Sequence, residues 1–159
     1  MIKLLEILEN KILLPRRVKE REKGYANYIQ KTIQGYLNDP EETTLDLSWT
    51  KSISLPDNFT VRGNLDLYGS KITKLPDNLK VGISLFLRDT EITTLPDNLQ
   101  VGFDLKIFYT KISTIPNNLK VGHDFIARHT PLAEKYTAEQ IQKMIEGRGG
   151  YVRGKIIID

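Results

Sequence analysis

The chain has 159 residues and a formal net charge of +3, and this length fits one domain with a short appendage. It contains no cysteine, which excludes disulfides, thiolate catalysis and cysteine-ligated zinc. The excess of 23 basic over 20 acidic side chains is too small on its own to indicate a nucleic-acid-binding protein.

Two short helices are predicted at the N-terminus. Apolar residues recur at helical spacing within residues 2–13, and Pro15 limits this first helix. Charged residues interrupt the same apolar run, so we expect neither a signal peptide nor a membrane span, and we predict a cytoplasmic protein. A second helical pattern runs over residues 17–37 and ends at the sequence NDP at 38–40. Both helices are expected to cover one end of the structure that follows.

Residues 44–123 form four copies of a 20-residue repeat, and a partial fifth copy begins at Asp124. The stretch LPDNLKVG at residues 75–82 is typical of the copies. Apolar residues fall in register in six columns at this spacing. The columns include Leu45, Leu47, Leu55, Phe59, Val61 and Ile72 and continue every 20 residues. Because one repeat cannot bury its apolar face alone, stacked copies are expected to form one continuous core.

Each repeat is predicted to contain a short strand, a turn, an extended segment and a second turn. The alternating leucines near the start of each copy have the period of a strand. One proline per copy, such as Pro76, favours extended backbone before it and prevents a helix through that segment. The Asn and Gly positions permit tight bends. The repeats therefore predict a solenoid with little room for a helix in each copy.

The pattern L-x-L-x-x-T-x-I-x-x-L-P over residues 44–132 resembles the leucine-rich repeat, in particular its short bacterial class. The resemblance implies a leucine-rich-repeat-like solenoid, and a β-solenoid of another cross-section is the alternative. Hydroxyl residues replace the usual asparagine and can still bond the turn backbone. They are Thr50, Ser70, Thr90, Thr110 and Thr130. Ser52 stands where isoleucine is expected, and Ile53 is expected to replace it through a local shift.

The chain also resembles a group of bacteriophage-encoded repeat proteins. The matching stretches are ILLPRRVKEREK at 12–23, the four repeats, and TPLAEKYTAEQIQKMIEGRGGYVRGKIIID at 130–159. The resemblance covers essentially the whole chain and implies a phage origin. Because members of that group are mostly without assigned function, it implies no particular activity.

A helix and a strand are predicted after the repeats. Thr137 begins the capping box T-x-x-Q, and the helix is expected to run to about Glu146 with Gly147 at its C′ position. The sequence YVRGKIII at 151–158 is strand-like and is expected to pair with the last coil. The predicted fold is an α+β repeat protein in three parts. These are a helical cap at residues 1–42, a solenoid of about 4.5 repeats at 43–132, and a helix–strand cap at 133–159.

The positions that vary between copies are the candidate binding residues. Two columns, one beginning at Asp46 and one at Ser48, alternate with buried strand residues and should face solvent, and a third column beginning at Trp49 ends the strand. Aromatic and arginine side chains on an exposed face are typical of protein-binding hot spots, although aromatics also suit strands generally. The predicted partner-binding residues are Trp49, Tyr68, Phe86, Arg88, Lys106, Phe108, Tyr109 and Arg128.

Other readings of the polar residues remain open. Nucleic-acid binding through Arg16, Arg17, Arg148 and Arg153 is the main alternative function, and a structural virion component is another. The basic run PRRVKEREKG at 15–24 is more simply a solvated helix start, and GRGGYVRGK at 147–155 a turn into a strand.

No metal, cofactor or catalytic residue is expected. The only histidines, His123 and His129, have no acidic cluster with metal spacing beside them in the sequence. Asp57, Asp77 and Asp97 form a column, but aspartate and asparagine after proline are ordinary turn residues. We therefore predict a non-enzymatic protein–protein interaction module. The resemblance to bacteriophage-encoded repeat proteins implies that its partner is a protein of the host, which this chain would bind or inhibit.

Overall fold

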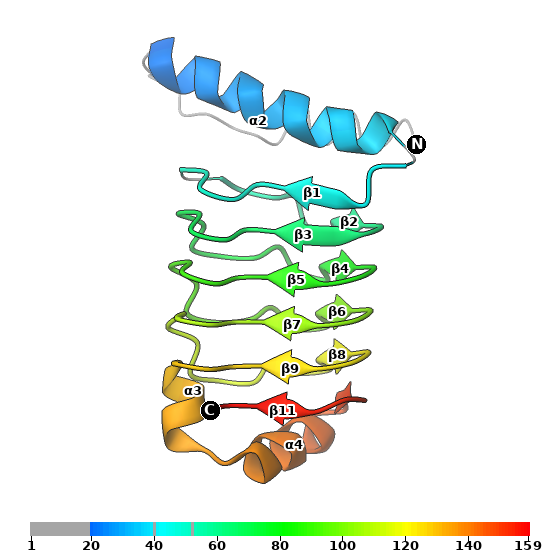
Figure 1. Cartoon of the computed structure of the whole chain (residues 1–159), viewed down its shortest axis with the longest axis vertical. Helices are drawn as coiled ribbons and strands as arrows, with labels where there is room; N and C mark the ends of the chain where they lie inside the picture. The colour runs from blue at the N-terminus through cyan, green and yellow to red at the C-terminus, as the bar shows by residue number, and fades with distance from the viewer. Residues whose placement is uncertain (1–19, 40, 52) are drawn as a thin grey trace.

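The computed structural model describes residues 20–39, 41–51 and 53–159, and the first predicted helix, Arg16, Arg17 and Ser52 lie outside the described residues. A helix, α2 (Glu20–Asn38), lies at one end of a stack of coils (Figure 1). Two further helices, α3 (Pro131–Lys135) and α4 (Ala138–Gly147), lie at the other end. The predicted α+β architecture is confirmed as a β-solenoid with a helix on its N-terminal side and helices and strands near its C-terminus.

The strands among the described residues form two parallel sheets. The first sheet contains, in spatial order, β1 (Thr44–Asp46), β3 (Asn64–Asp66), β5 (Leu85–Phe86), β7 (Leu105–Lys106), β9 (Phe125–Ile126) and β11 (Ile156–Ile157). The second sheet contains β2 (Thr60–Val61), β4 (Lys80–Val81), β6 (Gln100–Val101), β8 (Lys120–Val121) and β10 (Tyr151–Val152). Each coil therefore contributes one strand to each sheet. The sequence analysis predicted only the first of these as a strand and took the segment that includes Lys80–Val81 as extended chain and turn, although Leu79, Lys80 and Val81 alternate apolar and polar as the first strand does.

The register of the sheets follows the repeat. Leu65 pairs with Leu85, and Leu85 pairs with Leu105, so like residues stack on like residues. At the C-terminus, Ile156 pairs with Phe125, outside the 20-residue spacing, because α3 and α4 are inserted between these strands. The predicted pairing of the C-terminal segment with the last coil is thus confirmed, with one strand in each sheet.

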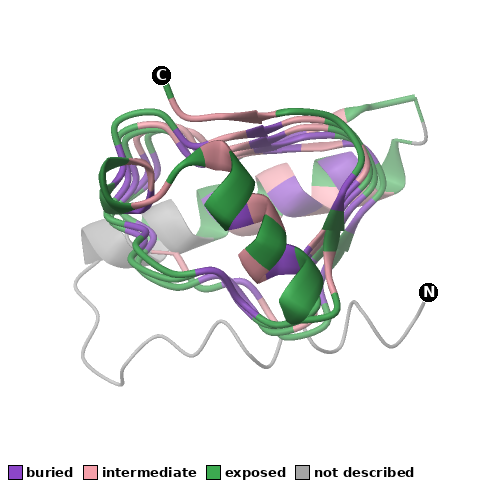
Figure 2. Cartoon of the chain, turned by 90° about the horizontal axis from the view of Figure 1, so that it is seen from below, coloured by how far each residue is buried: buried purple, intermediate pink, exposed green. Residues whose placement is uncertain are grey.

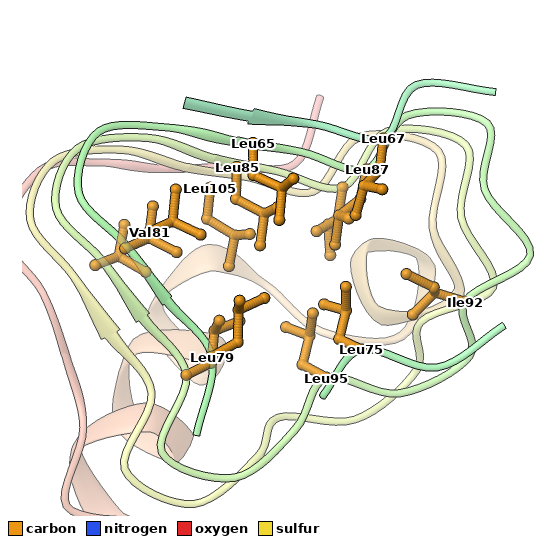
Figure 3. Packing of buried hydrophobic residues seen from close by; sticks show 14 of the residues in the cluster. Leu65, Leu67, Leu75, Leu79, Val81, Leu85, Leu87, Ile92, Leu95 and Leu105 are labelled. Carbon is orange, nitrogen blue, oxygen red and sulfur yellow. The ribbon is translucent and has the colours of Figure 1, made fainter. Parts of the chain in front are cut away.

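The six apolar columns are buried inside the coils, as predicted (Figures 2 and 3). Leu65, Leu85 and Leu105 are fully buried beneath the first sheet. The hydroxyl column is also buried, and its threonines bond the carbonyl three residues earlier, as in Thr90 Oγ1 to Leu87 O at 2.8 Å. The threonine hydroxyls thus replace asparagine in closing the turn, whereas the buried Ser70 hydroxyl, after β3, has no hydrogen-bond partner among the described residues. Ile53 packs partly buried against the core, in agreement with the predicted local shift.

Two columns of residues adopt left-handed backbone at the turns. The first holds Asn58, Asn78, Asn98 and Asn118, with φ between 54° and 60°, and the second holds Trp49, Gly69, Asp89, Tyr109 and His129. Asparagine tolerates this conformation better than most residues. The asparagines also form a ladder along the stack, for example Asn98 Nδ2 to Asn78 Oδ1 at 3.0 Å.

Close stacking explains the glycine column beside the second sheet. A Cβ added at Gly82, Gly102 or Gly122 would lie 2.0–2.1 Å from a backbone carbonyl oxygen of the preceding coil. Arg62 occupies this column in the first coil. It is permitted there because β2 is the edge strand of its sheet and no earlier strand lies against it.

Arg62 also joins α2 to the stack. Its guanidinium donates to the backbone carbonyls of Tyr36, Asp39 and Glu42 and lies over the Tyr36 ring at 4.2 Å. The Gly63 amide donates to the Tyr36 hydroxyl at 3.0 Å. Carbonyls at a helix end have no partner within the helix, so Arg62 supplies partners that the helix lacks.

The C-terminal cap confirms one detail of the sequence analysis and corrects another. Thr137 and Gln140 form the predicted capping box at the start of α4. The helix, however, includes Gly147, and the left-handed residue after it is Gly149 with a φ of 77°. The prediction of Gly147 at C′ was wrong because Gly149, two residues later, takes the left-handed conformation instead. The short helix α3 was not predicted.

Candidate functional site

The first sheet carries the predicted binding residues on its outer face. Phe86 lies in β5, between Asp66 of β3 and Lys106 of β7, in one register column. The next outward position holds Tyr68 and Arg88 in adjacent coils. Since the chain repeats every 20 residues, side chains from different coils come to lie side by side.

These side chains contact one another. The Trp49 and Tyr68 rings meet edge to face, with centroids 4.7 Å apart. The Arg88 guanidinium lies 5.5 Å from the Tyr68 ring and 5.4 Å from the Tyr109 ring. The predicted set is called the aromatic patch below. It consists of Trp49, Tyr68, Phe86, Arg88, Lys106, Phe108, Tyr109 and Arg128.

The patch extends over several coils. Lys106 Nζ lies 5.0 Å from the centroid of the Phe86 ring. The Tyr109 ring stacks on His129 with centroids 4.5 Å apart. Phe108 is half-buried and Arg128 is exposed, and both follow strands of the same sheet. The predicted residues thus belong to or follow strands of the first sheet, and their role in binding stays a prediction.

Two aromatic side chains of the patch project furthest into solvent. Trp49 is 68% exposed and Tyr109 is 50% exposed. Both have left-handed backbone, which turns their side chains away from the core at the end of a strand. Trp49 also covers Gly69, where an added Cβ would lie 2.6 Å from the indole ring. The available signal for this conformation was Gly69 and Asp89 in the same column, since both residue types adopt positive φ more readily than a bulky residue such as Trp49.

Acidic groups fix the cations of the patch in place. Arg88 Nε lies 3.2 Å from Asp89 Oδ2, and Lys106 Nζ lies 3.3 Å from Asp104 Oδ2. Each cation thus has a carboxylate partner beside the ring that it contacts. The exposed Arg88–Asp89 pair contributes little to stability.

One cluster corrects the sequence analysis. His123 Nδ1 lies 2.8 Å from Asp104 Oδ1 and 3.7 Å from Asp124 Oδ2, so an acidic group does accompany this histidine. The 20-residue repeat places Asp104 next to Asp124, and His123 directly precedes Asp124, so the repeat spacing was the available signal for this cluster. Burial alone would raise the pKa of the Asp104 carboxyl. Hydrogen bonds from His123, the Asp124 amide and Lys106 outweigh burial and hold that pKa below its usual value.

The same cluster is explained by protein contacts. One ligand atom from each of Asp104, His123 and Asp124 lies within 4.8 Å of the others, which is compatible with a metal ion. The carboxylate oxygens already accept donors of the chain, including the Lys155 amide on Asp124 Oδ1 at 2.8 Å. The geometry therefore matches a hydrogen-bonded corner between coils.

The remaining basic candidates lie apart from the patch. Arg148 follows α4, and Arg153 follows β10 at the end of the second sheet. The sequence analysis missed a groove of about 410 Å³ over that sheet, lined by Lys80, Lys120 and Arg153 among others. Lys80 and Lys120 share one column of the repeat, which was the available signal.

No protein-family model matches the chain, and neither a search of curated proteins nor a search of solved structures finds a match. Among the described residues, no helix combines the length and the apolar character that crossing a membrane requires.

Proposed function

We propose that the protein is a non-enzymatic interaction module that binds another protein through the aromatic patch. The observation that carries this proposal is the contact network across coils, in which Arg88 lies against both Tyr68 and Tyr109. Tryptophan, tyrosine and arginine are the residues most enriched at binding hot spots. The patch offers all three on one rigid face.

The solenoid beneath the patch supports this proposal. Leu87 and Ile107 are fully buried, and each lies between two outward-facing residues of its own coil. A core that holds the backbone in place reduces the entropy lost when the surface side chains bind. Tyrosine and tryptophan also provide a large contact area with few rotatable bonds.

The partner is proposed to be a protein of the host cell. This part of the proposal comes from the resemblance to bacteriophage-encoded repeat proteins, carried by the repeats and by the stretches at 12–23 and 130–159. A phage protein with a binding face and no catalytic constellation would act in the host cytoplasm by occupying, and so inhibiting, a host protein.

The test uses variants of the two most exposed aromatic residues. Trp49→Asn and Tyr109→Asn remove the rings, and asparagine tolerates the left-handed backbone at both positions. A protein that copurifies with the wild type from host lysate should bind the double variant more weakly by at least about 2 kcal/mol. Isothermal titration calorimetry with the purified partner measures this loss.

A matched control variant shows whether a loss of affinity comes from the aromatic patch. Tyr28→Ser removes an aromatic residue that is 61% exposed on α2 and is not part of the aromatic patch. It should leave the affinity unchanged, and circular dichroism should show the same fold for all variants. Unchanged affinity of the folded double variant would remove the aromatic patch as the binding site.

A further inference from the structure

The second sheet carries a groove whose floor is backbone. Its lining includes Gly82, Gly102 and Gly122, which lack side chains because the coils stack too closely to admit a Cβ. Arginine takes this position at the two ends of the column, with Arg62 in the edge strand β2, which has no earlier strand against it, and Arg153 in the C-terminal segment after β10. The groove therefore runs along the stack, across the strands, with a cation at each end.

The groove is basic. Lys80 and Lys120 lie along its side, two coils apart, or about 10 Å at the usual strand spacing. Among the described residues, no carboxylate lies within ion-pair distance of Lys80, Lys120 or Arg153. Arg62 is already committed to the carbonyls at the end of α2. Three cations of the groove are therefore available to an anionic ligand.

Aromatic rings lie at the groove and beside it along the chain. Tyr151 lines the groove, and the Arg153 guanidinium lies 5.2 Å from its ring. Phe103 and His123, each the residue after a groove glycine, stack in parallel with centroids 4.3 Å apart. Phe103 is 46% exposed. The rings in this region are thus accessible to a further flat group.

We propose that this groove binds single-stranded nucleic acid. Lys80, Lys120 and Arg153 would neutralise successive phosphates along the stack, and bases would stack on the exposed rings. A positively charged groove combined with aromatic rings is the usual arrangement for binding single strands without sequence preference. The groove lies on the second sheet, so this inference is independent of protein binding by the aromatic patch.

An acidic peptide fits the groove less well. The amides of Gly82, Gly102 and Gly122 donate to carbonyls of the preceding coil at 2.8–2.9 Å, so the floor has no amide donors there for an added strand. A peptide would gain the three cations but no backbone pairing. Bases can use the rings as well as the cations, which favours a nucleic acid.

The test measures binding of the full-length protein to a fluorescently labelled oligothymidine of about twelve nucleotides. Fluorescence anisotropy at several salt concentrations should give a slope of log affinity against log salt close to −2, because each phosphate contact on a single strand contributes about 0.7. Lys80→Ser with Lys120→Ser should weaken binding about tenfold or more and reduce the slope to about −0.7.

A control variant has the same charge and spacing. Lys71→Ser with Lys111→Ser removes two exposed lysines that are also two coils apart but lie outside the groove. It should keep nearly the wild-type affinity and slope. Arg153→Ser is a second groove variant at an exposed position, so the test does not depend on the double lysine variant alone. Equal loss in the control and groove variants would overturn the proposed site.

Competing ligands decide the class of partner. An oligoglutamate of matched charge should bind at least about fivefold more weakly than the oligothymidine, because it cannot stack. Equal or tighter binding of oligoglutamate would assign the groove to an acidic peptide, and tighter binding of a duplex of equal length would assign it to double-stranded nucleic acid. Either result, or the absence of binding at low salt, would overturn the inference.

Discussion

At the residue scale, departures from the repeat have physical causes in the stack. Gly82, Gly102 and Gly122 have no room for a Cβ, whereas Arg62 is accommodated because β2 is an edge strand with no earlier strand against it. The same stacking brings Asp104 next to His123, although 19 residues separate them. Neighbours along the stack therefore matter as much as neighbours along the chain.

Gly102→Ala is expected to destabilise the protein by about 1–3 kcal/mol or more, on the scale of overpacked sites. The added Cβ would lie 2.1 Å from the Gly82 carbonyl oxygen, and both atoms belong to paired backbone that cannot move freely. Gly35→Ala is the control, because it lies in α2 with no atom within 4 Å of an added Cβ. It should stabilise the protein by up to about 1 kcal/mol. Urea denaturation measures both, and a stable Gly102→Ala variant would contradict the stacking argument.

The lowered pKa of Asp104 predicts a loss of stability in acid. A carboxyl whose pKa is lower in the folded state stabilises the fold above its unfolded pKa, and that stabilisation is lost as pH falls through the folded pKa. Asp104→Asn removes this proton linkage, so its stability should fall less steeply than that of the wild type below about pH 4. Urea midpoints between about pH 3 and pH 7 give the comparison. Parallel curves would show that Asp104 does not contribute in this way.

At the element scale, the sequence predicted the positions at which the same type of side chain recurs in every copy. The apolar columns containing Leu65 and Leu79 mark the core positions directly, and aromatic residues outside those columns marked the outer face of the first sheet. The second sheet was missed although its segments, such as residues 79–81, alternate apolar and polar side chains, because each lies between two turn signals, Pro-Asp-Asn before it and glycine after it. The orientation of Trp49 was missed because its left-handed backbone depends on the turn, which holds Gly69 in the next coil.

The junction between α2 and the first coil should depend on Arg62. Arg62→Ala leaves backbone carbonyls at the end of α2 without a charged donor and is expected to cost about 1.5–3 kcal/mol. Hydrogen exchange followed by mass spectrometry should show faster exchange in α2 and in β1, with little change in β9. Uniform acceleration over all coils would indicate that α2 unfolds only with the whole stack.

Arg62→Lys separates charge from geometry at the same junction. A lysine keeps the positive charge but cannot donate to several carbonyls in the fixed geometry of a guanidinium. It should therefore recover only part of the lost protection in α2. Full recovery would show that charge near the helix end, rather than the individual hydrogen bonds, holds α2 to the stack.

At the scale of the whole molecule, one scaffold presents two different surfaces. The first sheet carries an aromatic and cationic patch, and the second sheet carries a basic groove with a backbone floor. Both depend on the same stacked core, whose ends are covered by α2 and by the C-terminal segment (Figure 1). Variants on the two surfaces should therefore act independently, whereas loss of an end cap should affect both.

Truncation after Tyr136 tests the importance of the C-terminal cap. It removes α4, β10 and β11, which cover the last coil and pair with β8 and β9. The truncated chain would expose apolar core residues such as Leu119 and Phe125, together with two unpaired strand edges. Solenoids need capped ends to remain soluble, and exposed edges promote association, so we expect aggregates or oligomers. Size-exclusion chromatography with light scattering measures the outcome.

Thr137→Ala is the control for the truncation. It costs only about 1 kcal/mol by loss of the helix cap, and it should remain monomeric if the wild type is monomeric. A folded, monomeric truncated protein would show that the coils are stable without this cap, and that the C-terminal segment serves mainly to complete the groove with Tyr151 and Arg153.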